Sequence, residues 1–324
     1  MPRPAASIVL AAFVALAVPA PLAAPPAVAP KAFLWALDGR SQPVRTGGPL
    51  YWRGGAAGDG AIGLETHPSV YLVWWGKQWQ RGFVIRDRDG RVFSSRALQR
   101  YVRVFFASLG GSAWAGVQTQ YCTASHGGAT TCDAADPHVG NPPHQLAGEW
   151  TDPAPVSSRS DSAVASVALR AAARLGYDPQ ATYVVLAPPG GDLPRGPVWC
   201  GFHSQTAAPG GTGRLQYAFI PWLNTDWPGL GRSGCGMHAV DRRSNALGNG
   251  IFDAWSIVGG HEYAESVTEP DDFGGVRDGW NDDYSAEAAD KCAWRGLRDV
   301  ELGTHRFAVQ PLWSNEANAC VVSR

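Results

Sequence analysis

The sequence G-G-H-E-Y-A-E-S-V-T-E-P, residues 259–270, places an imidazole and two carboxylates within one predicted helix. The residues just before it, 251–258, are largely apolar. Together the two stretches predict a long helix over about residues 251–268, which begins as a buried segment and ends before a proline. The ionisable side chains therefore start where the buried segment ends.

His261 and Glu265 are four residues apart, so they project from the same face of this helix, and Glu262 lies about 100° round from His261. This geometry suits two metal ligands flanked by a general base. In a zinc hydrolase a helix supplies two ligands, and the adjacent glutamate takes a proton from water whose pKa the metal has lowered to roughly 7. The usual motif is H-E-x-x-H, and here Glu265 replaces the second histidine.

The plainer interpretation of this H-E-x-x-E stretch is a solvated turn of an amphipathic helix. The apolar residues that precede it argue against that interpretation. An unpaired charge at the end of a buried helix costs several kcal/mol or becomes neutral, so the group needs a partner. A metal ion is the simplest partner.

A third ligand is expected from the acid-rich segment 278–292. Glu287 and Asp290 are three residues apart and can share one face of a short helix or turn. We expect Glu287 to bind the metal and Asp290 to accept the free ring N–H of His261. Exchanged roles for Glu287 and Asp290 are the alternative, and a surface turn or a calcium site is the plainer interpretation of the segment.

The rest of the chain predicts one α/β domain with a mixed sheet, helices packed on it, many loops and disulfide bonds. The chain contains 39 Gly and 25 Pro among 324 residues, which is why much of it is expected to be loop. Apolar runs predict strands, and helical spacing ended by glycine predicts helices. The expected strands cover residues 70–75, 182–187 and 215–220, and the expected helices cover about residues 95–109 and the stretch from Ser160 or Asp161 to just before Gly176.

Six cysteines, an even number, are typical of an oxidising compartment. Their spacing favours sequential pairing among the 15 possible connectivities. A cysteine zinc site is the competing interpretation, but no C-x-x-C motif occurs. The predicted pairs are Cys122 with Cys132, Cys200 with Cys235, and Cys292 with Cys320.

Several segments together resemble a pattern found in secreted bacterial proteins, which is related to the phosphate-induced, or EXORDIUM-like, family of plants. The segments are H-E-Y-A-E-S-V-T-E-P at 261–270, Gly-Trp at 279–280, E-x-x-D-x-C at 287–292, V-Y-L-V-W-W-G at 70–76, W-C-G-F-H-S at 199–204 and Y-A-F-I at 217–220. The resemblance covers about residues 68–320 and implies a shared fold. Plant relatives largely lack the His and Glu pair, so an activity is not implied by them.

The beginning of the chain reads as a secretory signal peptide over residues 1–24, with Arg3 ahead of a short apolar run and small residues near its end. Residues 25–67 are interpreted as a linker and N-terminal segment, and residues 68–324 as the α/β domain. The apolar run is too short for a membrane span, and no later stretch resembles one. We therefore expect a secreted protein, extracellular or periplasmic, with no membrane partner after signal cleavage.

The formal net charge of −1 and the lack of a basic run argue against nucleic acid as a partner. The chain has 14 Trp. Trp74, Trp75 and Trp79 could bind cell-wall sugar or polymer, but tryptophan is more often a core residue.

Two further histidines, His203 and His238, are weaker candidates for the cleft. His203 could contact substrate and His238 could serve as a reserve metal ligand, but a hydrogen-bonded structural histidine is the more frequent role for either. A serine hydrolase is disfavoured because no G-x-S-x-G motif is present.

The leading hypothesis is a secreted metal-dependent hydrolase, a zinc-type metallopeptidase acting on a peptide or protein. His261, Glu265 and Glu287 are the expected ligands, and Glu262 is the expected base. Oxygen-rich ligation also suits Mn or Ca. The alternatives are a non-catalytic extracellular protein with a structural ion and a module that binds cell-wall carbohydrate.

Overall fold

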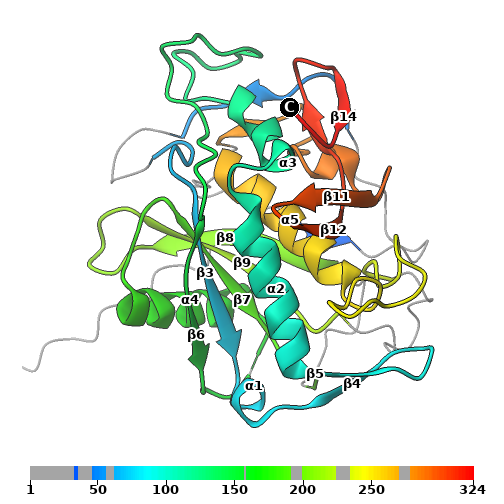
Figure 1. Ribbon diagram of the computed structural model, residues 1–324. Helices are drawn as coiled ribbons and strands as arrows, with labels where there is room; N and C mark the ends of the chain where they lie inside the picture. The colour runs from blue at the N-terminus through cyan, green and yellow to red at the C-terminus, as the bar shows by residue number, and fades with distance from the viewer. Residues whose placement is uncertain are drawn as a thin grey trace, which may run out of the picture.

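The computed structural model describes residues 33–35, 46–55, 62–156, 158–190, 199–223, 234–269 and 278–324. The predicted signal peptide lies outside these residues. A six-stranded mixed sheet occupies the centre of the described part, in the order β1-β8-β9-β7-β3-β6 (Figure 1). Its strands are β1 (Phe33–Trp35), β3 (Ser69–Trp75), β6 (Leu146–Asp152), β7 (Ala181–Leu186), β8 (Trp199–Ala207) and β9 (Arg214–Ile220).

The sheet is mixed because its two halves pair differently. β7 is parallel to both β3 and β9, and β6 is parallel to β3. β8 runs antiparallel to β9, and β1 runs antiparallel to β8. The predicted α/β class with a mixed sheet is therefore confirmed.

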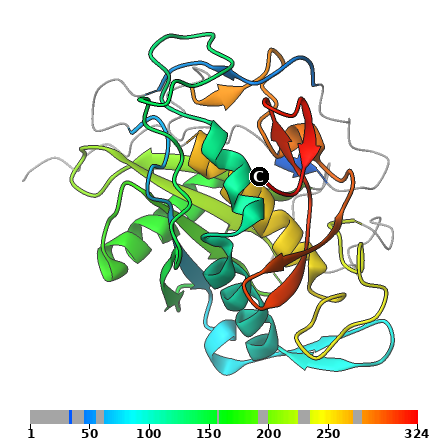
Figure 2. The same cartoon turned by 45° about the horizontal axis from the view of Figure 1, so that its top comes forward.

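Helices cover both faces of this sheet (Figures 1 and 2). Alternate residues of β3 point to opposite faces. Leu72 and Trp74 pack in the core that contains α2 and α5, whereas Val73 and Trp75 pack in the core against α4. These helices are α2 (Ser95–Leu109), α4 (Asp161–Leu175) and α5 (Asp253–Thr268).

Short elements complete the fold around the sheet. Two-stranded sheets among the described residues pair β2 (Tyr51–Trp52) with β10 (Trp280–Asn281), β4 (Val84–Arg86) with β5 (Val92–Ser94), β11 (Arg298–Leu302) with β12 (His305–Val309), and β13 (Leu312–Ser314) with β14 (Ala319–Val321). The short helices are α1 (Gln78–Arg81), α3 (Ala113–Gly116), η1 (Val117–Gln120) and η2 (Asp290–Cys292). β1 pairs with β8, and β2 pairs with β10. The folded unit therefore extends N-terminal to the boundary predicted at residue 68.

The predicted elements agree closely with the observed ones. The serine hydroxyls of Ser94 and Ser160 cap α2 and α4, accepting hydrogen bonds from the third following backbone N–H. The helix predicted from residue 251 instead begins at Asp253. Trp74, Trp75 and Trp79 are buried, as expected of core residues. All three predicted disulfides, Cys122–Cys132, Cys200–Cys235 and Cys292–Cys320, are confirmed.

Every residue of α5 is buried, and this burial rules out a solvated amphipathic helix. Gly260 permits the close packing at the turn before the ionisable residues. A Cβ atom there would lie 3.1 Å from the Trp114 ring and 3.3 Å from the Phe105 ring. The His261, Glu262 and Glu265 side chains therefore start from a backbone enclosed by neighbouring elements.

The described residues contain no helix whose length and apolar character would allow it to cross a membrane. The three disulfides are typical of proteins that fold in an oxidising compartment.

Candidate metal centre

Six ionisable side chains from three segments form a buried cluster between α5, β8 and the turn that leads into η2. In this cluster the imidazoles and carboxylates lie within contact distance of one another. Each of these residues is less than a tenth exposed. The members are His203 from β8, His261, Glu262 and Glu265 from α5, and Glu287 and Asp290 from the turn.

His261, Glu265 and Asp290 form the first group of three in this cluster. His261 Nε2 lies 3.0 Å from Glu265 Oε1 and 3.7 Å from Asp290 Oδ1. Asp290 is held in place because its backbone N–H donates to Glu265 Oε1 at 3.0 Å. Two ligands on a tetrahedral zinc ion with bonds of about 2.1 Å lie roughly 3.4 Å apart. The three atoms are therefore spaced as ligands of one ion.

The second ring nitrogen of His261 is occupied by Gln310. The side-chain amide of Gln310 donates from Nε2 to the carbonyl of Ala289 at 2.8 Å, which leaves its Oε1 as an acceptor 3.3 Å from His261 Nδ1. Nδ1 therefore carries the proton in the neutral imidazole, and Nε2 presents its lone pair to Glu265 and Asp290. This is the tautomer that a metal-binding histidine requires.

His203 lies between the helix carboxylates and the turn. Its Nδ1 is 3.3 Å from Glu265 Oε2 and 3.5 Å from Glu262 Oε2. Its Nε2 is 3.5 Å from Glu287 Oε2. His203, Glu262 and Glu265 make a second group with metal-ligand spacing.

Several polar atoms in the middle of the cluster have no well-aligned hydrogen-bond partner among the described residues. Buried polar atoms are normally satisfied, so each exception requires an explanation. Among the described residues, the three carboxylates nearest the centre form ion pairs only with His203 and His261, and none with a lysine or arginine. These carboxylates belong to Glu262, Glu265 and Asp290. The atoms are both ring nitrogens of His203, His261 Nε2, both oxygens of Glu262, Glu265 Oε2 and Asp290 Oδ1.

The pKa shifts of the cluster reflect both its burial and the charges that its members place on one another. Burial alone lowers the pKa of an imidazole, but the neighbouring glutamates outweigh it and raise the pKa of His203 to about 10 and that of His261 to about 9. Burial opposes ionisation of Glu265 too, yet the two histidines lower its pKa to about 2. Burial still raises the pKa of Glu262 and of Asp290. Two imidazoles thus do not compensate all the carboxylates, and a bound cation would.

Gly201 on β8 makes room for the Glu262 carboxylate. A Cβ atom at this position would lie 2.5 Å from Glu262 Oε1 and 2.8 Å from Val258 Cγ1, which is closer than nonbonded atoms approach. A side chain at residue 201 would therefore displace Glu262 from His203. The neighbouring residue Cys200 is fixed by its disulfide to Cys235.

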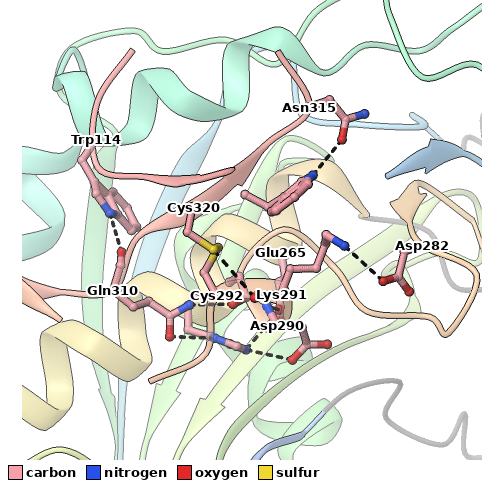
Figure 3. The surroundings of a disulfide bond; sticks show 12 residues. Trp114, Glu265, Asp282, Asp290, Lys291, Cys292, Gln310, Asn315 and Cys320 are labelled. Atoms are coloured by element: carbon pink, nitrogen blue, oxygen red, sulfur yellow. Dashed lines mark hydrogen bonds and ion pairs between the residues drawn. A yellow bond between two sulfur atoms is a disulfide. The ribbon is translucent and has the colours of Figure 1, made fainter. Parts of the chain in front are cut away.

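The Cys292–Cys320 disulfide anchors the turn that carries Asp290, and Figure 3 shows Asp290 and Glu265 beside it. Lys291, between Asp290 and Cys292, is directed elsewhere. Its ammonium group donates to the Gly48 carbonyl, lies 3.3 Å from Asp282 Oδ2 and sits over the Trp313 ring. The turn therefore brings the Asp290 carboxylate into the cluster, whereas the ammonium group of the neighbouring Lys291 points to other partners.

The structure gives Asp290 and Glu287 roles that differ from the predicted ones. Asp290, not Glu287, joins His261 and Glu265, so the ligand is the one of the exchanged assignment, but Glu287 does not take the other role. Glu287 faces His203, and the acceptor for the ring N–H of His261 is Gln310 instead of Asp290. These differences arise because η2 begins at Asp290 and brings its backbone onto Glu265.

His203 and His238, the two weaker candidates for the cleft, have different surroundings in the structure. His203 lies in the cluster, although a structural role seemed more frequent for it. His238 has both ring nitrogens engaged, one 2.7 Å from Asp87 Oδ1 and the other 2.9 Å from the Asp241 carbonyl. His238 is therefore a hydrogen-bonded structural histidine.

Gln310 was not anticipated, because no motif surrounds it in the sequence. His203 did have a signal, since it belongs to the W-C-G-F-H-S stretch of the resemblance.

No protein-family model, curated protein or solved structure matches the chain significantly. The resemblance to secreted bacterial and EXORDIUM-like proteins stays a prediction, and the function must be inferred from the cluster itself.

Proposed function

We propose that this chain is a metal-dependent hydrolase of the metallopeptidase type, with its metal bound by His261, Glu265 and Asp290. The observation that carries the proposal is the buried ring nitrogen Nε2 of His261. It faces two carboxylates at ligand spacing while Gln310 holds the opposite nitrogen. A metal bound here would polarise a substrate carbonyl and acidify water, which amide hydrolysis requires.

Glu262 is the proposed general base. It follows His261 directly in α5, and neither of its carboxylate oxygens has a well-aligned hydrogen bond among the described residues. Burial raises its pKa, which makes the carboxylate a stronger proton acceptor than an exposed glutamate. The zinc-hydrolase arrangement of a base next to a ligand on one helix thus applies with Glu265 in place of the second histidine.

Zinc is the proposed cofactor because it binds both imidazole nitrogen and carboxylate oxygen in compact sites with three protein ligands. Oxygen atoms outnumber nitrogen in this set, so manganese and calcium are included in the test. The substrate class proposed is a peptide or protein, in a secreted setting consistent with the disulfides.

Complete burial of the cluster favours a second candidate function, a non-catalytic extracellular protein with a structural ion. Both candidate functions require a bound metal, but only the first predicts hydrolysis of a substrate. Metal analysis of the purified chain, paired with digestion of a peptide library, separates them. We expect bound divalent metal and cleavage that a chelator abolishes and added Zn²⁺ or Mn²⁺ restores. Metal without cleavage would indicate a structural ion, and a chain that binds no metal would contradict both candidates.

Metal affinity is expected to rise with pH. In the metal-free protein the pKa values of His203 and His261 are raised to about 10 and about 9, so both imidazoles are protonated at neutral pH. A cation must displace a proton from each imidazole that it binds, and this competition weakens as pH increases. The apparent affinity should increase roughly ten-fold per pH unit for each imidazole displaced. Competition with a chromogenic chelator at several pH values below 9 would measure it. An affinity independent of pH would exclude the imidazoles as ligands.

A further inference from the structure

We propose that the centre holds two divalent cations that share the carboxylate of Glu265. This inference rests on the metal centre proposed above and extends it to a second position. A carboxylate that gives one oxygen to each of two cations holds them at about the 3.5–4 Å spacing of two-metal hydrolytic sites.

The two groups of ligand atoms use different oxygens of Glu265. Oε1 lies 3.0 Å from His261 Nε2, whereas Oε2 lies 3.3 Å from His203 Nδ1. The first group is completed by Asp290 and the second by Glu262, whose Oε2 is 3.5 Å from His203 Nδ1. Glu265 is the single residue common to both groups. One cation bound by His261, Glu265 and Asp290 would leave the His203 side without a partner.

The second ring nitrogen of each histidine provides independent support. His261 directs Nδ1 to Gln310 Oε1 at 3.3 Å, and His203 directs Nε2 to Glu287 Oε2 at 3.5 Å. In both cases an oxygen outside the ligand group faces the nitrogen that would not bind metal. Metal-binding histidines almost always have such an oxygen partner, which fixes the tautomer and orients the ring. Each histidine thus has an oxygen on the side away from its ligand group, hydrogen-bonded in the case of His261 and at ion-pair distance in the case of His203.

The charge of the cluster also accommodates two ions. The four carboxylates of the cluster, Glu262, Glu265, Glu287 and Asp290, carry four negative charges when ionised. With both imidazoles neutral, one divalent cation leaves two negative charges in a buried site, which is costly. Two divalent cations balance the four carboxylates.

Glu262 can bind the second cation and still act as the general base. Its Oε2 faces His203 and the second position, while its Oε1 lies over Gly201 and has no well-aligned hydrogen bond. A carboxylate that binds a cation through one oxygen can still accept a proton through the other. The second position therefore does not remove the base that the proposed hydrolysis uses.

Titration of the metal-free full chain with Mn²⁺ tests the second position. We expect two Mn²⁺ per chain at saturation and an electron paramagnetic resonance spectrum of two magnetically coupled ions. His203→Ala should lower the stoichiometry to one and give the spectrum of an isolated Mn²⁺. His238→Ala is the matched control, because it removes a histidine whose side chain is 4% exposed and whose ring nitrogens contact Asp87 and the Asp241 carbonyl, and it should retain two ions.

The outcomes separate this inference from the proposed function. Saturation of the wild-type chain at one Mn²⁺ would overturn the two-metal centre and leave the single-metal hydrolase intact. No bound Mn²⁺, and equally no Zn²⁺, would overturn both. Two uncoupled ions, both retained in His203→Ala, would place the second ion outside this cluster. The wild-type measurement decides the matter even if a variant fails to fold.

Discussion

Glu265→Gln is expected to lower the affinity of the chain for Zn²⁺ by more than about 100-fold, beyond the 10- to 100-fold typical of residues that only orient ligands. Glu265 approaches both histidines, with Oε1 3.0 Å from His261 Nε2 and Oε2 3.3 Å from His203 Nδ1. The substitution keeps the volume of the side chain and an oxygen that can accept from the Asp290 N–H. It removes the charge that a cation needs, and an amide oxygen is a much weaker ligand than a carboxylate. Calorimetric titration with Zn²⁺ would measure the loss.

Glu287→Gln is the matched control for this experiment. Glu287 is also a buried glutamate of the cluster, but it faces the Nε2 atom of His203 and belongs to neither group of ligand atoms. We expect its affinity for Zn²⁺ to stay within about 10-fold of wild type. The opposite ranking would have Glu287→Gln lose the metal and Glu265→Gln retain it. That result would make Glu287 the ligand and contradict the assignment of Glu265 as a ligand. Circular dichroism of both variants would exclude loss of the fold as the cause.

Glu262→Gln is expected to lower turnover by about 10²- to 10⁴-fold, the usual contribution of a general base. The amide has the shape of the carboxylate but cannot take a proton from metal-bound water. The ion bound by His261, Glu265 and Asp290 should be retained, because Glu262 is not in that group. Turnover would be measured on a substrate from the peptide library, and metal content on the same sample.

Glu65→Gln provides a buried glutamate outside the cluster as the control. Glu65 is fully buried, accepts a hydrogen bond from the hydroxyl of Thr182, and has a pKa raised well above its usual value by burial. Burial thus favours its neutral form, for which an amide is a close replacement. We expect normal turnover in this variant. Hydrolysis at the full wild-type rate in Glu262→Gln would exclude Glu262 as the base.

The helices α2, α4 and α5 and the strands β3, β7 and β9 were predictable because their signals are local, whereas β1, β6 and β8 of the same sheet were not predicted. Serine caps and terminal glycines mark α2 and α4, and apolar runs mark β3, β7 and β9. The i, i+4 spacing of His261 and Glu265 on one helix face follows from helix geometry alone. The sequence also indicated the need for a partner, since ionisable groups follow directly on an apolar segment.

Tertiary structure decided which residues meet those of α5. His203 comes from a strand 58 positions before His261, and Gln310 follows 49 positions after it. No local pattern relates such distant residues, because their contact depends on how β8 and the chain after β12 pack against the helix. The choice of Asp290 over Glu287 likewise depends on the backbone hydrogen bond from Asp290 to Glu265. The sequence by itself determined the helix and the chemistry that it carries, whereas long-range packing determined the ligand set, because side chains on separate elements converge only when the core is formed.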